Sequence, residues 1–172
     1  QVAQKAALLM NADTLAGGLI QEAKTSEQQA DVALTNGEFV VARQYYETAQ
    51  QQYARAETQA RTEQQQQIQR AKVAARETQV AHDYVRALAS DLESLPAYQE
   101  ARATHQHATS LFTTNQYAQA ETAYRQARQQ YEHASQAAEQ RRITSAQERM
   151  QAAQEEAVHA GAPQFCADEW IE

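Results

Sequence analysis

The stretch Phe39–Ala60, FVVARQYYETAQQQYARAETQA, decides the fold of this chain. Its apolar residues recur at alternating steps of three and four, so they share one face of an α-helix. Alanines on that face let a neighbouring helix approach, and aromatic rings fill the space between. The predicted structural seam consists of Phe39, Ala42, Tyr46, Ala49, Tyr53 and Ala56. We expect its tyrosines to pack in a core; an aromatic ligand-binding box is the alternative interpretation.

The same seam returns further along the chain. Its second copy consists of Tyr117, Ala120, Tyr124, Ala127, Tyr131 and Ala134. Gln1-Val2-Ala3 likewise returns as Gln79-Val80-Ala81. A fixed period, here about 78 residues, indicates a repeat array. We therefore predict helical repeat 1 at residues 1–78, helical repeat 2 at 79–156 and the start of a truncated third repeat at 157–172.

Two short turns punctuate the expected helices. Asn36-Gly37 and Thr114-Asn115 contain glycine and asparagine, the residues that most easily adopt the left-handed backbone of a tight reversal. Helices near 19–35 and 96–113 should end there. After the second of these turns, we expect the final helix to continue through residues 140–160.

Helix breaks are expected before these helices as well. In the first repeat the break falls at Asn11–Thr14 and at Gly17-Gly18. In the second it falls at residues 90–96, where Ser94 should cap the next helix and Pro96 should occupy its first turn.

The longest predicted helix covers residues 38–89 and would measure about 75 Å at 1.5 Å per residue. It contains no helix-breaking residue, and its polar run Thr62–Gln67 is interpreted as a solvated connector. Its first half closes one repeat and its second half opens the next. The expected fold is all-α: tandem antiparallel three-helix units, one per period, joined by a long continuous helix into an elongated rod or solenoid.

Two family resemblances accompany this pattern. Asn36-Gly37-Glu38-Phe39, followed by Ala42, Tyr45, Tyr46 and Ala49, resembles the turn and second helix of a tetratricopeptide repeat. Residues 115–127 match the same pattern with Asn115 in place of glycine. The period of 78 differs from that family's 34, and no peptide-binding residues are transferred. The three-helix topology resembles a spectrin-type repeat. Similar alanine-rich hairpin arrays are spacers or docking segments in long bacterial proteins. From this resemblance we expect a bacterial source.

Charge and composition narrow the function classes. The net charge is −7 and the 15 basic residues are dispersed among acids, so we expect no nucleic-acid binding. No apolar run is long enough to span a membrane. The single cysteine, Cys166, excludes an internal disulfide framework without fixing the compartment; a cytoplasmic location is preferred over a periplasmic one.

The histidines give no metal-binding pattern. His105 and His107 point about 200° apart on a helix, so they cannot hold one ion together. His133 could approach either of these histidines across the bundle only in one helix register, and the sequence does not specify that register. His159 and Cys166 lie near Asp168 and Glu169, but this spacing fits no established zinc motif. We predict no metal and no cofactor.

Catalytic motifs are also missing from the sequence. No Ser or Cys has the context of an activated nucleophile, and Gly17-Gly18 is not a phosphate-binding loop. We predict a non-enzymatic helical scaffold, spacer or docking module for a protein partner or for flanking domains of the same polypeptide.

Two other functions remain open. The seams could serve a coiled-coil oligomerisation stalk, although the helix breaks interrupt a long coil, so we expect a monomer. A ligand-sensing bundle would need a pocket among Tyr46, Tyr84 and Tyr124.

Overall fold

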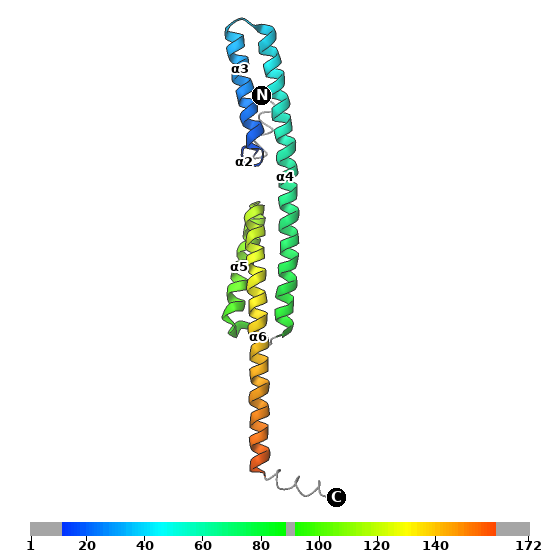
Figure 1. The fold of residues 1–172 in the computed structure, drawn as a ribbon, viewed down its shortest axis with the longest axis vertical. Helices are drawn as coiled ribbons and strands as arrows, with labels where there is room; N and C mark the ends of the chain where they lie inside the picture. The colour runs from blue at the N-terminus through cyan, green and yellow to red at the C-terminus, as the bar shows by residue number, and fades with distance from the viewer. Residues whose placement is uncertain (1–11, 89–91, 161–172) are drawn as a thin grey trace. The chain divides into compact units, whose positions relative to one another are not determined.

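The computed structural model describes residues 12–88 and 92–160, and every regular element in this part of the chain is a helix (Figure 1). The elements are α2 (Ala12–Leu15), α3 (Gly17–Thr35), α4 (Phe39–Leu88), the 3-10 turn η1 (Leu92–Ser94), α5 (Pro96–Thr113) and α6 (Tyr117–His159). The predicted all-α class is confirmed. Alanine and glutamine favour helix because they lose little side-chain freedom there.

Two compact units divide the chain, residues 1–72 and 73–172. The boundary lies inside α4, since Ala74 already belongs to a hydrophobic cluster with α5 and α6. The predicted third segment, 157–172, lies mostly outside the described residues, as does the start of the predicted first repeat, residues 1–11.

In the first unit, α3 and the first part of α4 form an antiparallel hairpin (Figure 1). Its core is thin, because Ile20 and Tyr53 are the large side chains of a cluster that otherwise consists of alanine. The cluster comprises Ala12, Ala16, Ile20, Ala23, Ala49, Tyr53, Ala56 and Ala60. Alanine at most of these positions lets the two helices approach closely.

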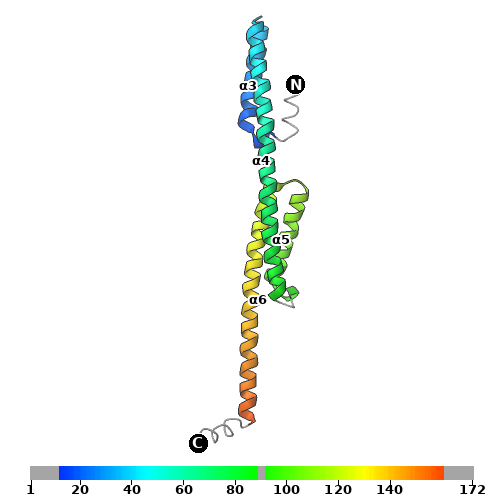
Figure 2. The same ribbon diagram turned by 90° about the vertical axis from the view of Figure 1, so that its right-hand side faces the viewer.

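In the second unit, three helical segments pack together: α4 from Val73 onward, α5, and the first half of α6 (Figures 1 and 2). One cluster contains Val85, Leu95, Tyr98, Ala101, Tyr131, Ala134 and Ala138, and the other contains Ala74, Ala108, Ala120, Ala123 and Tyr124. Each cluster contains residues from all three segments. Separating any one segment from the other two would therefore expose apolar surface to water.

The two interhelical turns have the same hydrogen bonds. Gly37 has φ 79° and Asn115 has φ 61°, as the turn residues predict. In each turn the amide after the left-handed residue donates to the carbonyl five residues before it, at 2.9 Å: Glu38 to Ala33, and Gln116 to Leu111. This pattern is that of a Schellman C-cap, which satisfies carbonyls left free at a helix end.

Two predicted breaks are wrong. Residues Ala12–Leu15 form a helical turn, and Gly17-Gly18 opens α3 instead of interrupting it. The interruption is confined to Ala16, whose φ of −142° is non-helical. Glycine destabilises a helix mainly in its interior, through the backbone freedom it loses, and Gly17 and Gly18 lie at the N-terminal end of α3.

The predicted cap at Ser94 is also wrong. The residue at the start of α5 is Leu95, which makes no side-chain capping bond and is buried in the core, while Pro96 takes the first turn as predicted. Ser94 instead accepts a hydrogen bond at Oγ from Nη1 of Arg141, at 3.0 Å. Burying leucine at this position has replaced the cap that the sequence favours.

The last part of α6 differs from the rest of the unit. The helix continues through residues 140–159 as predicted, and every side chain from 141 to 160 is exposed. None of the described helices combines the length and the apolar composition that a membrane span requires.

Candidate functional site

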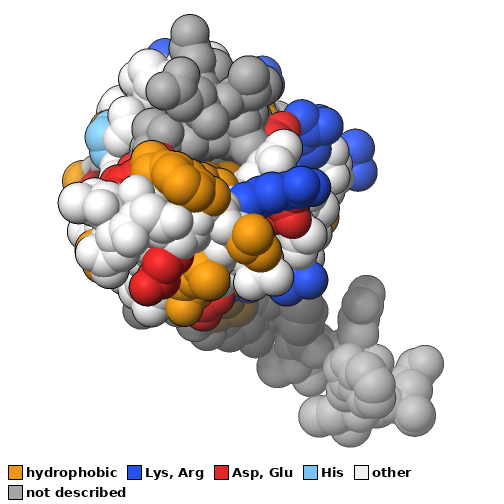
Figure 3. Space-filling view, turned by 90° about the horizontal axis from the view of Figure 1, so that it is seen from above, with side chains coloured by type: hydrophobic (Ala, Val, Ile, Leu, Met, Phe, Trp, Pro, Cys, Tyr) orange, Lys and Arg blue, Asp and Glu red, His pale blue; other side chains and the backbone are white. Residues whose placement is uncertain are grey.

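The end of the first hairpin exposes an apolar surface. We call it the α3–α4 end and define it by five exposed side chains: Val32, Leu34, Phe39, Val40 and Val41. Phe39 is 70% exposed and Val40 is 72% exposed. Figure 3 looks onto this end of the hairpin and shows hydrophobic side chains there beside charged ones. Exposed apolar groups gathered in one place mark an interaction surface more often than singly scattered ones do.

The second hairpin has the same turn with a different surface. One period after Val32, Val40 and Val41, the chain has Ser110, Ala118 and Gln119. The hydrogen bonds of the turn need none of the three valines, because the second hairpin makes them with these replacements. The turn therefore does not require valine at these three positions, whereas Leu34 and Phe39 have the aromatic equivalents Phe112 and Tyr117.

An open groove of about 340 Å³ runs along one side of the α3–α4 end. Thr25, Gln28, Gln29, Val32, Ala33 and Asn36 line it from the α3 side, and Glu38, Val41 and Tyr45 line it from the α4 side. Val32 and Val41 belong to the α3–α4 end, so the groove and the exposed apolar surface are continuous. The lining is suited to an amphipathic segment, because apolar side chains alternate with amides that can exchange hydrogen bonds.

The predicted seam residues are mostly buried. The buried members are Ala42, Ala49, Tyr53, Ala56, Ala120, Tyr124, Ala127, Tyr131 and Ala134. Tyr117 is half-buried with its ring 5.3 Å from that of Phe112, whereas Phe39 is exposed and Tyr46 is 38% exposed. Phe39 begins α4 as Tyr117 begins α6, but only the ring of Tyr117 has an aromatic neighbour in the described residues, Phe112.

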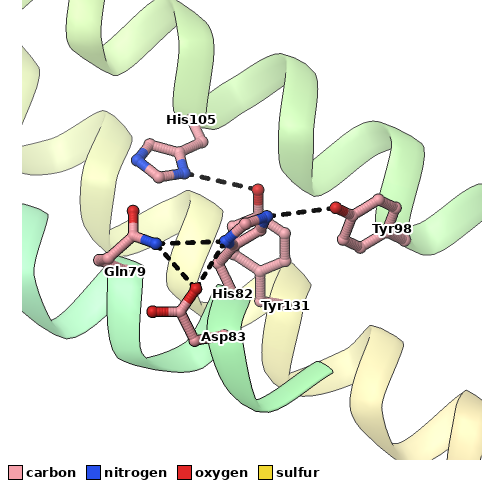
Figure 4. A network of polar contacts seen from close by, with 6 residues as sticks. All are labelled: Gln79, His82, Asp83, Tyr98, His105 and Tyr131. Atoms are coloured by element: carbon pink, nitrogen blue, oxygen red, sulfur yellow. Dashed lines mark hydrogen bonds and ion pairs between the residues drawn. The ribbon is translucent and has the colours of Figure 1, made fainter. Parts of the chain in front are cut away.

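A cluster of two histidines and two tyrosines lies in the second unit (Figure 4). The histidine–tyrosine cluster consists of His82 on α4, Tyr98 and His105 on α5, and Tyr131 on α6. His82 Nε2 is 3.2 Å from the Tyr98 hydroxyl, and His105 Nδ1 is 3.4 Å from the Tyr131 hydroxyl. The ring centroids of His82 and His105 are 6.2 Å apart. Three helices thus meet through aromatic rings that are also hydrogen-bonded.

Burial in this cluster favours the neutral forms of His105 and Tyr131. Burial, and to a lesser degree the neighbouring His82, lowers the pKa of His105 from its ordinary value. Burial raises the pKa of Tyr131 to about 12, with Tyr98 contributing in the same direction. A neutral imidazole can accept a hydrogen bond at Nδ1, so these shifts agree with donation from the Tyr131 hydroxyl to His105.

The first hairpin carries the equivalent tyrosine contacts one period earlier. The Tyr53 hydroxyl donates to Glu27 Oε2 at 3.0 Å, at the positions of Tyr131 and His105. In two further equivalent pairs, the Tyr46 hydroxyl donates to Asp31, and the Tyr124 hydroxyl donates to Thr109 Oγ1 at 3.3 Å. The geometry of the tyrosines is shared, while the acceptors differ.

The structure separates the histidines that the sequence analysis compared. His107 and His133 are exposed, and His105 faces His82. Within residues 12–88 and 92–160, no group of three or more His, Cys, Asp or Glu side chains is arranged to hold a metal. Cys166, Asp168 and Glu169 lie outside the described residues.

The tyrosines considered for a ligand pocket have separate partners. Tyr84 is 53% exposed and donates to Glu139 Oε1 at 2.9 Å. Tyr124 is buried and bonded to Thr109, and Tyr46 is bonded to Asp31. Each of the three hydroxyls is thus engaged by a side chain of its own unit.

The sequence did not single out His82, which the structure places beside Tyr98 and His105. Its neighbours belong to two other helices, so no local motif could reveal it.

No protein-family model, curated protein or solved structure matches this chain.

Proposed function

We propose that this chain is a non-enzymatic helical repeat scaffold that docks a protein partner and sets its distance from flanking parts of a larger protein. The observation that carries the docking role is the exposed apolar α3–α4 end. It is supported by the second hairpin, which makes the same turn with Ser110, Ala118 and Gln119 in place of the valines. The partner would present an amphipathic surface to the groove beside Val32, Val41 and Tyr45.

The repeat part of the proposal rests on equivalent contacts. The two turns share their hydrogen bonds, and the two tyrosine pairs of each hairpin recur at the same period. The spacing part rests on α4, whose 50 residues form one uninterrupted helix of about 75 Å. Tandem three-helix units joined in this way would form an elongated rod.

The coiled-coil alternative is less well supported for the two predicted seams. Ala49, Tyr53 and Ala56 are already buried in their own hairpin, and so are Ala127 and Tyr131. Seams that are filled within one chain are not free to form a core with another.

Docking is tested by substituting three residues of the first hairpin with their equivalents from the second. The variant Val32→Ser/Val40→Ala/Val41→Gln carries the residues of the equivalent positions. A partner retained from source-organism lysate by residues 1–172 is identified and then titrated against purified chain. We expect the variant to bind that partner at least about tenfold more weakly.

The matched control is Val73→Ser/Val80→Ser, which removes two valines that are 52% and 70% exposed elsewhere on α4. It should bind like the unmodified chain. Equal binding by the grafted variant would overturn the assignment of the surface. The spacing role is tested by small-angle X-ray scattering, for which a compact globular profile would contradict the proposed rod.

A further inference from the structure

The exposed part of α6 carries an apolar stripe of its own. We call residues 141–159 the α6 arm. Ile143, Ala146, Met150, Ala153 and Ala157 follow one another at steps of three and four, which places them on one helix face. All five are exposed, and Ile143 and Met150 are 52% and 63% exposed. This is the heptad spacing of a two-helix seam, and nothing within the described residues covers it.

The stripe is not a copy of the seam with which α4 enters the second unit. Thr78 of α4 is fully buried there, and its hydroxyl donates to the backbone oxygen of Tyr124. One period later the arm has Glu156 in place of Thr78, and His159 in place of Ala81. A carboxylate cannot donate that bond and is costly to bury. The arm therefore cannot pack as α4 does, and its apolar stripe needs a different kind of cover.

Charges beside the stripe indicate what would cover it. Arg142, Arg149 and Glu156 each precede a stripe residue and follow one another at the heptad interval. In a symmetric antiparallel pair, Arg142 of each copy would face Glu156 of the other, giving two opposite-charge pairs. Arg149 would meet its counterpart at the axis, so two attractive contacts oppose one repulsive contact. In a parallel pair Arg142 and Arg149 would face Gln147 and Gln154, with no charge complementarity.

We propose that residues 143–157 of α6 bind the same segment of a second copy of this chain as an antiparallel helix pair. The contact is isologous, so one two-fold axis closes it as a dimer. The sequence predicted a monomer because helix breaks would interrupt a long coiled coil. However, α6 has no break between Tyr117 and His159. Alanine at three of the five stripe positions lets the two helices approach closely. This contact is independent of the α3–α4 end.

Sedimentation equilibrium of residues 1–172 over a wide concentration range tests the pairing. We expect a reversible monomer–dimer equilibrium. Met150→Glu should leave the chain monomeric, because it places one carboxylate of each copy in the seam. Gln151→Glu is the matched control: it adds the same charge one position away, off the stripe, and should dimerise like the unmodified chain. Helical content by circular dichroism should be unchanged in both, since each site is exposed.

Charge reversal tests the orientation. Arg142→Glu should weaken the dimer by about tenfold, because both opposite-charge pairs become repulsive. Adding Glu156→Arg to that variant should restore the dimer, since each pair again joins opposite charges.

Three results would overturn the proposal. If the chain stays monomeric at the highest concentration, the α6 arm does not bind a second copy, and its apolar stripe would have to bind a different protein. A dimer that persists in Met150→Glu forms through another surface. A double charge reversal that stays as weak as the single one excludes the antiparallel order.

Discussion

The hydroxyl of Tyr131 lies 3.4 Å from Nδ1 of His105, joining α6 to α5 inside the second unit. Tyr131 is 1% exposed, and its pKa is raised to about 12, so the phenol keeps its proton. Burial lowers the pKa of His105 and so favours the neutral ring, which can accept the hydrogen bond of that phenol at Nδ1. Protonating the imidazole would turn Nδ1 into a donor, so it could no longer accept the bond from the phenol, and would place a cation near His82.

Stability of the second unit should therefore depend on His105 and pH. The folded chain holds the pKa of His105 below 6.5, so the unfolded chain takes up the proton first as pH falls. The contribution of this group is complete above about pH 6.5 and declines as pH falls through that value. Urea unfolding at a series of pH values should show a smaller decline for His105→Gln than for the unmodified chain. His107→Gln, at an exposed position two residues away, should behave like the unmodified chain. Equal pH dependence in all three would contradict the assignment.

Removing the Tyr131 ring should destabilise the chain far more than removing its hydroxyl. Tyr131→Ala leaves a cavity in the core and should cost about 3–5 kcal/mol. Tyr131→Phe loses one hydrogen bond and should cost about 1 kcal/mol. Tyr46→Ala, at a position 38% exposed, should cost less than Tyr131→Ala. The measurement is the free energy of unfolding in urea, followed by circular dichroism. Similar losses for both alanine variants would show that the ring is not a core anchor.

The hydroxyl of Thr78 should stabilise the contact between α4 and α6. It lies 2.7 Å from the backbone oxygen of Tyr124 and 2.8 Å from that of Ala74. Thr78→Val keeps the shape but leaves a buried carbonyl without this donor, so we expect a loss of about 1–2 kcal/mol. Thr58→Val is the matched control, because Thr58 bonds within its own helix, to the Ala54 carbonyl, and is exposed. A loss for the control as large as for Thr78→Val would locate the effect in helix propensity.

The two left-handed turn positions should respond in opposite directions. Gly37→Ala should destabilise the chain by about 1 kcal/mol, although a Cβ there would meet no atom within 4 Å, because the penalty lies in the backbone. Asn115→Gly should be neutral or slightly stabilising, since glycine tolerates φ 61° without strain. Thermal unfolding of the two variants decides this, and tolerance of Gly37→Ala would argue against a left-handed turn.

Helix positions were accessible from the sequence because they follow from local chemistry. Pro96 and the Thr114-Asn115 turn bound α5 at the predicted residues, and the missing breaker between 39 and 88 gives α4. The glycine pair at 17–18 misled the prediction, since glycine is as acceptable in the first turn of a helix as it is before one.

Contacts between helices were not accessible in the same way. His82 reaches Tyr98 only because α4 and α5 pack in one particular register, which no spacing along the chain specifies. Phe39 fits the seam period and is nevertheless exposed, because periodicity gives the face of a helix but not how far the neighbouring helix extends.

A tyrosine contacts Glu27 in the first hairpin, and its equivalent contacts His105 in the second, so this position accommodates either side chain beside the phenol. An acid and a base occupy the same place beside the same phenol, with the surrounding alanines unchanged in kind. The same phenol position thus joins two helices through a carboxylate in one hairpin and through an imidazole in the other.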